Sequence, residues 1–138
     1  MKREKDFTKE VKQKILIASG GLKDVFNPFE TCSLIEDVVY SVYTKNQVEI
    51  DTLPMVDGGE YSIDVLADYL KVEKNIIHNI VGPTGREKSC EYLAIDHETV
   101  FIASSSVLAL SIDCDSKVKN PLFLTSYGLG QLIDSCHL

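Results

Sequence analysis

The sequence has 138 residues, of which 44% are hydrophobic and 25% charged, a composition typical of a soluble globular protein with its own core. The formal net charge is −7, and because nucleic-acid binding requires clustered Lys and Arg, this balance argues against a nucleic-acid partner. The sequence has no apolar run near the ~20 residues of a membrane span and no secretory signal, so we expect a cytoplasmic protein without membrane contact.

The N-terminal part predicts a leader and then a buried strand. Residues 1–13 interleave basic and acidic side chains and are expected to be flexible. Residues 14–18 form a short apolar run of the kind that is buried in a parallel sheet. The run ends at Ser19-Gly20-Gly21, and Lys23 follows shortly after. A glycine turn that leads to a helix, with a lysine nearby, is able to hold an anion.

A helix is predicted next. Asn27 is a good N-cap, Pro28 suits the first helical position, and Glu30 stands three residues after the cap. The residues spaced to face the core are Leu34, Ile35, Val38, Val39 and Val42. Residues 14–53 therefore predict strand, helix and strand, a βαβ unit with a right-handed crossover.

The second strand runs into a glycine corner. Gly58 and Gly59 lie between this strand and a helical pattern that begins near Ile63, and Asp57 and Glu60 flank them. Glycine lets backbone amides approach a ligand closely, and a helix N-terminus favours an anion. An alternative stays open, because the two carboxylates could simply serve that helix end as a cap and a dipole partner.

The remaining sequence predicts a small antiparallel meander and a last helix. Strands are expected at 75–80, 90–95 and 99–103, with a hairpin turn at 82–85. Residues 107–112 are ambiguous between helix and strand, and 113–119 form a charged loop. Ser126 is expected to cap a final helix.

These elements place the chain in the α/β class, with a βαβ unit followed by an antiparallel meander and a C-terminal helix. We expect a leader at 1–13, an α/β lobe at 14–72 and a β-rich lobe at 73–138, with the alternative that the lobes share one core. Cysteines at 32, 90, 114 and 136 form no C-x-x-C pair, and the scattered histidines give no metal-ligand spacing. No metal site is predicted.

Two nucleotide-binding motifs are excluded. Gly128-Leu129-Gly130 lacks the third glycine and the downstream acidic residue of a dinucleotide fingerprint. The turn before Lys23 lacks the phosphate-loop pattern. Motifs alone therefore indicate an α/β protein with two turns suited to anions.

A family resemblance adds to this interpretation. Four blocks follow one another along the chain: residues 14–18 with their turn and Lys23, residues 53–60, residues 81–85 and residues 120–133. The second block, Leu-Pro-Met-Val-Asp-Gly-Gly-Glu, is the most specific. In this order the blocks resemble the type-1 (bacterial) glycerate kinase family, of which the chain would be a truncated N-terminal part.

The resemblance implies phosphorylation of glycerate from ATP with a divalent metal, in a cleft between two α/β lobes. The candidate catalytic residues are Asp57, Lys23 and Glu60. The candidate ligand-binding residues are the small residues of the first two blocks and of the fourth: Gly20, Gly21, Gly58, Gly59, Thr125, Ser126 and Gly128.

The chain also departs from the family pattern. The first turn usually reads Pro-Asp-Ser-Phe-Lys-Gly, of which only Lys23 is kept, and Ala103-Ser104-Ser105 replaces a Glu-Met-Ala pattern. Tyr61 replaces a usual glycine and would crowd the backbone. Family members are well over twice as long, and the chain stops before a glycine-rich segment that they contain.

Phosphoryl transfer depends on positioning and on charge stabilisation by metal, lysine and backbone donors. We therefore expect impaired or no stand-alone kinase activity, with ATP and magnesium as cofactors only if a partner completes the chain. The expected ligand is a small organic acid or phosphate. Three alternatives stay open: half of a split kinase completed by a second polypeptide, a lobe recruited to other chemistry with Asp57 or Glu60 as general base and Lys23 as electrostatic partner, and a remnant that forms homo-oligomers.

Overall fold

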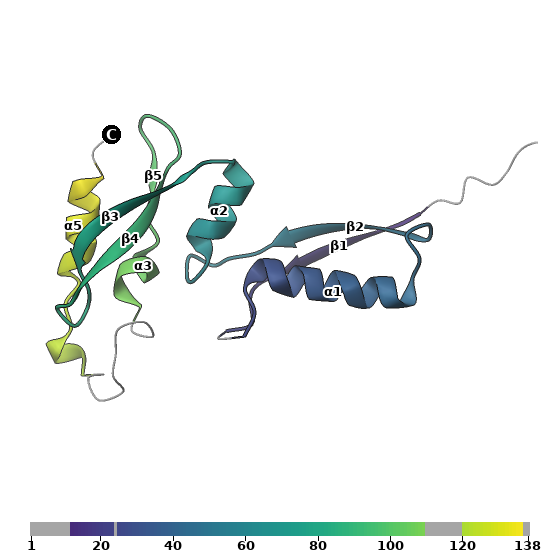
Figure 1. Cartoon of the computed structure of the whole chain (residues 1–138), viewed down its shortest axis with the longest axis horizontal. Helices are drawn as coiled ribbons and strands as arrows, with labels where there is room; N and C mark the ends of the chain where they lie inside the picture. Colours follow the sequence, from purple (N-terminus) through teal and green to yellow (C-terminus); the bar gives the residue numbers. More distant parts are fainter. Residues whose placement is uncertain (1–11, 24, 110–119, 137–138) are drawn as a thin grey trace, which may run out of the picture. The chain divides into compact units, whose positions relative to one another are not determined.

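The computed structural model describes residues 12–23, 25–109 and 120–136. The chain divides into two compact units, Met1–Met55 and Val56–Leu138, which are described separately below (Figure 1). The expected leader lies outside the described residues as far as residue 11, and Gln13 already belongs to the first strand. Among the helices that the structure describes, none combines the length and apolar character needed to cross a membrane.

The first unit is the predicted βαβ unit. Strand β1 (Gln13–Ser19) is followed by helix α1 (Pro28–Val42) and strand β2 (Val48–Pro54). The two strands pair in parallel, from Gln13 opposite Val48 to Ser19 opposite Pro54, and α1 runs alongside them (Figure 1). The carboxyl ends of both strands therefore lie next to each other, joined by a 2.9 Å hydrogen bond from the backbone N–H of Met55 to the carbonyl of Ser19.

Helix α1 begins where the sequence predicts, because its cap is local chemistry. The Asn27 side chain accepts a hydrogen bond from the backbone N–H of Glu30 at 2.9 Å. The Glu30 carboxylate accepts one from the backbone N–H of Asn27 at 2.8 Å. Together they form a capping box, and Pro28 fills the first helical position without the loss of a donor.

The prediction of which α1 residues face the core is wrong. The helix buries Pro28, Thr31 and Cys32, and the Cys32 thiol lies 3.9 Å from the carbonyl oxygens of both Ile17 and Ser19. Of the expected face only Val39 is half-buried, and the other members are exposed: Leu34, Ile35, Val38 and Val42. The described sheet of this unit has two strands, and two strands are too narrow to cover the whole apolar side of the helix.

The second unit contains the predicted meander. Its elements are α2 (Ser62–Leu70), β3 (Lys74–Val81), β4 (Glu87–Ala94), β5 (Val100–Phe101), α3 (Ser104–Leu108), η1 (Pro121–Phe123) and α5 (Tyr127–Ser135). The three strands form an antiparallel sheet in the order β3-β4-β5, as expected. The ambiguous segment 107–112 begins as helix α3, whereas its last three residues and the expected loop at 113–119 lie outside the described residues.

Two small apolar clusters hold the second unit together. One joins β3 and β4 to α3 and α5 through Ile80, Cys90, Val107 and Leu132. The other joins α2 to the sheet through Ile63, Leu93 and Ala103. Because Ile63 packs in this second cluster, α2 belongs with the meander. The chain therefore divides after Met55, whereas the sequence analysis expected the division after residue 72.

Helix α5 approaches β3 unusually closely at Gly128. A Cβ on this buried glycine would overlap the carbonyl oxygen of Val81. Two hydrogen bonds accompany the contact: the backbone N–H of Val81 donates to the Gln131 side chain at 2.9 Å, and the N–H of Thr125 donates to the Pro83 carbonyl at 2.9 Å. Packing alone therefore explains why glycine occupies position 128, without reference to a ligand.

Replacement of Gly128 by alanine should destabilise the protein by about 2 kcal/mol or more, because the backbone of Val81 must move or the helix must retreat. Urea unfolding followed by circular dichroism measures this loss.

The matched control is Gly130→Ala, two residues further along the same helix, where nothing lies within 4 Å of an added Cβ. Alanine is the better helix former, so this variant should be more stable by up to about 1 kcal/mol. Equal losses in the two variants would contradict the packing argument.

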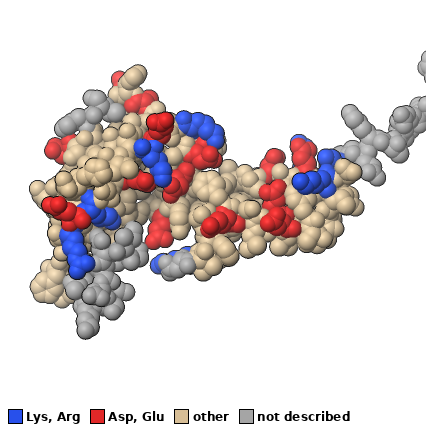
Figure 2. Space-filling model, in the orientation of Figure 1, with Lys and Arg blue, Asp and Glu red and all other residues tan. Residues whose placement is uncertain are grey.

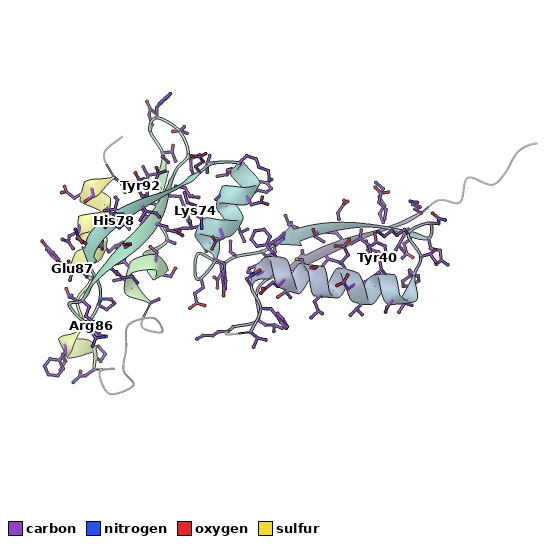
Figure 3. All side chains as sticks on the ribbon, viewed as in Figure 1. Tyr40, Lys74, His78, Arg86, Glu87 and Tyr92 are labelled. Atoms are coloured by element: carbon purple, nitrogen blue, oxygen red, sulfur yellow. The ribbon has the colours of Figure 1, made fainter. Side chains whose placement is uncertain are left out.

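One basic side chain ties α2 to the sheet. The Lys74 ammonium, labelled in Figure 3, lies 2.7 Å from a carboxylate oxygen of Asp64 on α2 and 3.4 Å from the carboxylate of Glu91 on β4. The hydrogen bond to Asp64 is the main reason why the pKa of Lys74 is raised above its ordinary value. A raised lysine pKa stabilises the folded state below pH ~10.4 and loses that contribution as the pH rises through the folded-state pKa.

Lys74→Gln should therefore cost about 0.5 kcal/mol at neutral pH, a small value because the side chain is partly exposed and screened. The difference from wild type should shrink as the pH rises through the raised folded-state pKa of Lys74, where the ammonium loses its proton. Thermal unfolding from pH 7 to 11.5 provides the measurement. Lys71→Gln, which removes an exposed pair with Asp68, is the control and should cost less at pH 7.

Candidate functional site

The glycine corner of the sequence leads into α2 in the second unit. The carboxylate of Asp57 accepts a hydrogen bond from the backbone N–H of Gly59 at 3.0 Å, which closes a short side-chain-to-backbone turn. Asp57, Gly58 and Glu60 are exposed, and Gly59 is half-buried. The corner is therefore open to solvent and is not packed into the core.

The backbone of this corner adopts left-handed conformations on both sides of Glu60. Gly58 has φ +92°, which glycine tolerates without strain. Tyr61, the N-cap of α2, has φ +64° and ψ +2°, and its side chain makes no capping hydrogen bond. The family resemblance implies glycine at this position, and a left-handed backbone suits glycine better than tyrosine.

Ser62 is a polar residue of this corner that sequence reasoning did not select. It is the first residue of α2, only 1% exposed, and its hydroxyl has no hydrogen-bond partner among the residues that the structure describes. Buried hydroxyls are normally satisfied, so an orphaned one beside a helix N-terminus is a notable feature. In the sequence, the position of Ser62 shortly after the Asp57–Gly59 turn is the feature that could have identified it.

The glycine turn after β1 belongs to the first unit. The backbone N–H of Leu22 donates to the carbonyl of Phe26 at 2.9 Å, and a Cβ on Gly21 would lie 2.8 Å from that same carbonyl oxygen. Gly21 is thus required for the turn to close, whereas Gly20 and Lys23 are exposed. Because Lys23 and Asp57 belong to different units, their joint action stays a prediction.

The candidates near the C-terminus lie at the start of α5. Ser126 occupies the N-cap position but makes no side-chain capping bond, so its expected capping role is wrong. The hydroxyl of Thr125 caps the helix instead, and accepts a hydrogen bond from the backbone N–H of Tyr127 at 3.1 Å. Thr125 and Ser126 are exposed, and their role in ligand binding, like that of the buried Gly128, stays a prediction.

Charged side chains are mixed on the surface. On the face shown in Figure 2, acidic and basic groups of the second unit alternate and form no large basic patch. Within the described ranges, no group of three or more His, Cys, Asp or Glu side chains is arranged to hold a metal ion.

Comparison with known proteins identifies the family. The model of the glycerate kinase family matches residues 15–137. The chain belongs to this family. Its relatives include the glycerate kinases of Bacillus cereus, with 31% identity over 121 residues, and of Haemophilus influenzae, with 32% identity over 121 residues.

The glycerate kinase match is confined to part of these relatives. It covers 87% of this chain and 31% of the length of each relative, so the chain spans about a third of the proteins it matches. A crystal structure of a Salmonella typhimurium LT2 protein assigned as glycerate kinase 2 has the same fold, with a TM-score of 0.65 and 24% identity. That match covers 88% of this chain and 32% of the other.

The glycine corner yields a prediction about Tyr61. Tyr61→Gly should stabilise the protein by about 1 kcal/mol, because glycine adopts the left-handed backbone of this position without a Cβ clash. Thermal or urea unfolding provides the value.

The control is Tyr69→Gly, which removes another exposed tyrosine from the last turn of α2. There the substitution should cost up to about 0.5 kcal/mol, since glycine is a poorer helix former than tyrosine. If both variants lost stability alike, the Tyr61 ring would contribute packing that outweighs its backbone strain.

Proposed function

We propose that this glycerate-kinase-like chain binds a small hydroxy acid such as glycerate at the corner formed by Asp57–Ser62, and that it has little or no kinase activity by itself. The observation that carries the proposal is the open position of Asp57, Gly58 and Glu60 at the start of α2. The named relatives are glycerate kinases, and glycerate is therefore the first ligand to test.

The chemistry of the corner suits a molecule that has both a carboxylate and hydroxyls. The N-terminus of α2 carries a partial positive charge, which favours a carboxylate or phosphate. One oxygen of Asp57 accepts from Gly59, and within the described residues the other oxygen has no partner, so it can accept a ligand hydroxyl.

The proposal of impaired catalysis rests on what phosphoryl transfer requires. Transfer from ATP depends on a metal ion, cationic side chains and backbone donors that surround the phosphates together. The chain spans about a third of the length of its relatives, so in this proposal ATP and Mg²⁺ act only when the remainder of a kinase fold is present.

Isothermal titration calorimetry and thermal shift with glycerate, 3-phosphoglycerate and inorganic phosphate provide the test. Glycerate should bind wild type, and Asp57→Ala should abolish the binding. Asp57→Asn should keep the turn, because the amide oxygen still accepts from Gly59, yet should weaken binding by about tenfold through loss of the charged acceptor. An assay for ADP with MgATP and glycerate should give no turnover above background.

The matched control is Asp51→Ala, which removes an exposed carboxylate from β2 and changes the net charge by the same amount. It should bind glycerate like wild type. The proposal is overturned if none of the three compounds binds wild type at millimolar concentration, or if Asp57→Ala binds glycerate unchanged.

A further inference from the structure

Three buried polar atoms without a hydrogen-bond partner come from segments that adjoin β4. They are the hydroxyl of Thr84, the ammonium nitrogen of Lys88 and the hydroxyl of Ser106. Among the described residues, the hydroxyl of Ser62 is the other side-chain atom of this kind. Buried polar groups are normally satisfied, and where one is not, a bound ion or water is a common reason. An ammonium beside two hydroxyls points to an anion.

Lys88 lies on the face of β4 that α3 and α5 cover. It pairs across the sheet with Ile80, which is buried in one cluster with Val107 of α3 and Leu132 of α5. Paired residues of an antiparallel sheet share a face. Cys90, two residues further along β4, belongs to the same cluster. The half-buried side chain of Lys88 therefore starts beside this apolar cluster.

The two hydroxyls belong to segments next to Lys88. The Cys90 thiol donates to the carbonyl of Ser106 at 3.6 Å, which holds Ser106 against β4. Two residues of a strand span about 7 Å, so the contact of Ser106 with β4 lies about that far along the strand from Lys88. Thr84 lies in the turn between β3 and β4, four residues before Lys88. The three donors thus come from a turn, a strand and a helix of the same unit.

The described elements around Lys88 supply no counter-charge. Helices α3 and η1 contain no charged residue, and α5 contains one, Asp134, which is exposed in its last turn. Glu87 and Glu91 alternate with Lys88 along β4 and so face the other side, where Glu91 lies 3.4 Å from the ammonium of Lys74. A buried charge is costly unless it is paired, and an anion from solution would pair it.

We propose that Thr84, Lys88 and Ser106 bind a tetrahedral oxyanion of the phosphate class. The ammonium supplies positive charge and N–H donors, and each hydroxyl supplies one more donor. A tetrahedral phosphate presents acceptor oxygens in several directions, which suits donors from three separate segments better than a planar carboxylate does. The anion is inorganic phosphate or the phosphate group of a small phosphorylated compound.

This site is independent of the ligand proposed for residues 57–62. Helix α2 packs on the opposite face of the sheet, where Ile63 meets Leu93. Asp57→Ala should therefore leave phosphate binding unchanged, and Lys88→Met should leave glycerate binding unchanged. Each proposal is able to fail while the other stands.

The test is thermal unfolding of the full chain in an oxyanion-free buffer, with millimolar sodium phosphate added at constant ionic strength. Phosphate should raise the Tm of wild type, since a ligand of the folded state stabilises it. Lys88→Met keeps the aliphatic stem and should weaken phosphate binding by at least about tenfold in calorimetry, through loss of the charged donor. Without phosphate this variant should be at least as stable as wild type, because an unpaired buried charge is gone.

Two uncharged substitutions test the hydroxyls separately. Thr84→Val and Ser106→Ala should each weaken phosphate binding by about threefold or more, and they keep the test valid if Lys88→Met folds poorly. Calorimetry with 3-phosphoglycerate beside inorganic phosphate distinguishes the two sources of the anion, because the tighter ligand identifies the source.

The matched control is Lys71→Met, which removes the same charge from an exposed lysine of the same unit. It should respond to phosphate like wild type. The proposal is overturned if millimolar phosphate leaves the Tm of wild type unchanged, or if Lys71→Met weakens phosphate binding as much as Lys88→Met. It is also overturned if Asp57→Ala abolishes phosphate binding, because the anion would then lie at residues 57–62.

Discussion

The close approach of α5 to β3 at Gly128 is the constraint on which the second unit depends. No side chain fits between the helix and the carbonyl of Val81. The approach lets Leu132 reach the apolar cluster with Ile80, and it places Gln131 where its side chain satisfies a backbone donor of β3. One missing Cβ thus permits a packing contact and a hydrogen bond together.

This contact also changes how the family resemblance is understood. The blocks at 81–85 and 120–133 are far apart in sequence, but they meet through Val81, Pro83, Thr125 and Gly128. Their joint presence is explained by packing, as is the requirement for Gly21 in the first turn. The block at 53–60 is different, since Asp57, Gly58 and Glu60 are exposed. Burial in a core does not account for these three residues, which is why they carry the functional proposal.

Local chemistry was predictable from the sequence, and features set by tertiary partners were not. The capping box at Asn27 involves residues three apart, so its sequence pattern determines its geometry. The core face of α1 depends on how many strands lie beneath the helix, which periodicity does not reveal. Ser126 and Thr125 are both plausible caps by residue type, and only the backbone path decides that Thr125 makes the bond. The orphaned hydroxyl of Ser62 likewise depends on what surrounds it.

Two features of the chain combine a formed backbone with unfavourable side chains. They are the exposed Leu34, Val38 and Val42 of α1, and the strained Tyr61. Among the described residues, a capping box and the parallel pair β1–β2 accompany α1 without a third strand in that sheet. Its apolar arc nevertheless has the width that suits a larger sheet, and three exposed aliphatic side chains leave about 1–2 kcal/mol each of burial unrealised. At Tyr61 the backbone keeps the left-handed form that suits glycine although the side chain opposes it. In both places the unfavourable energy lies in side chains, and the backbone keeps its conformation despite it.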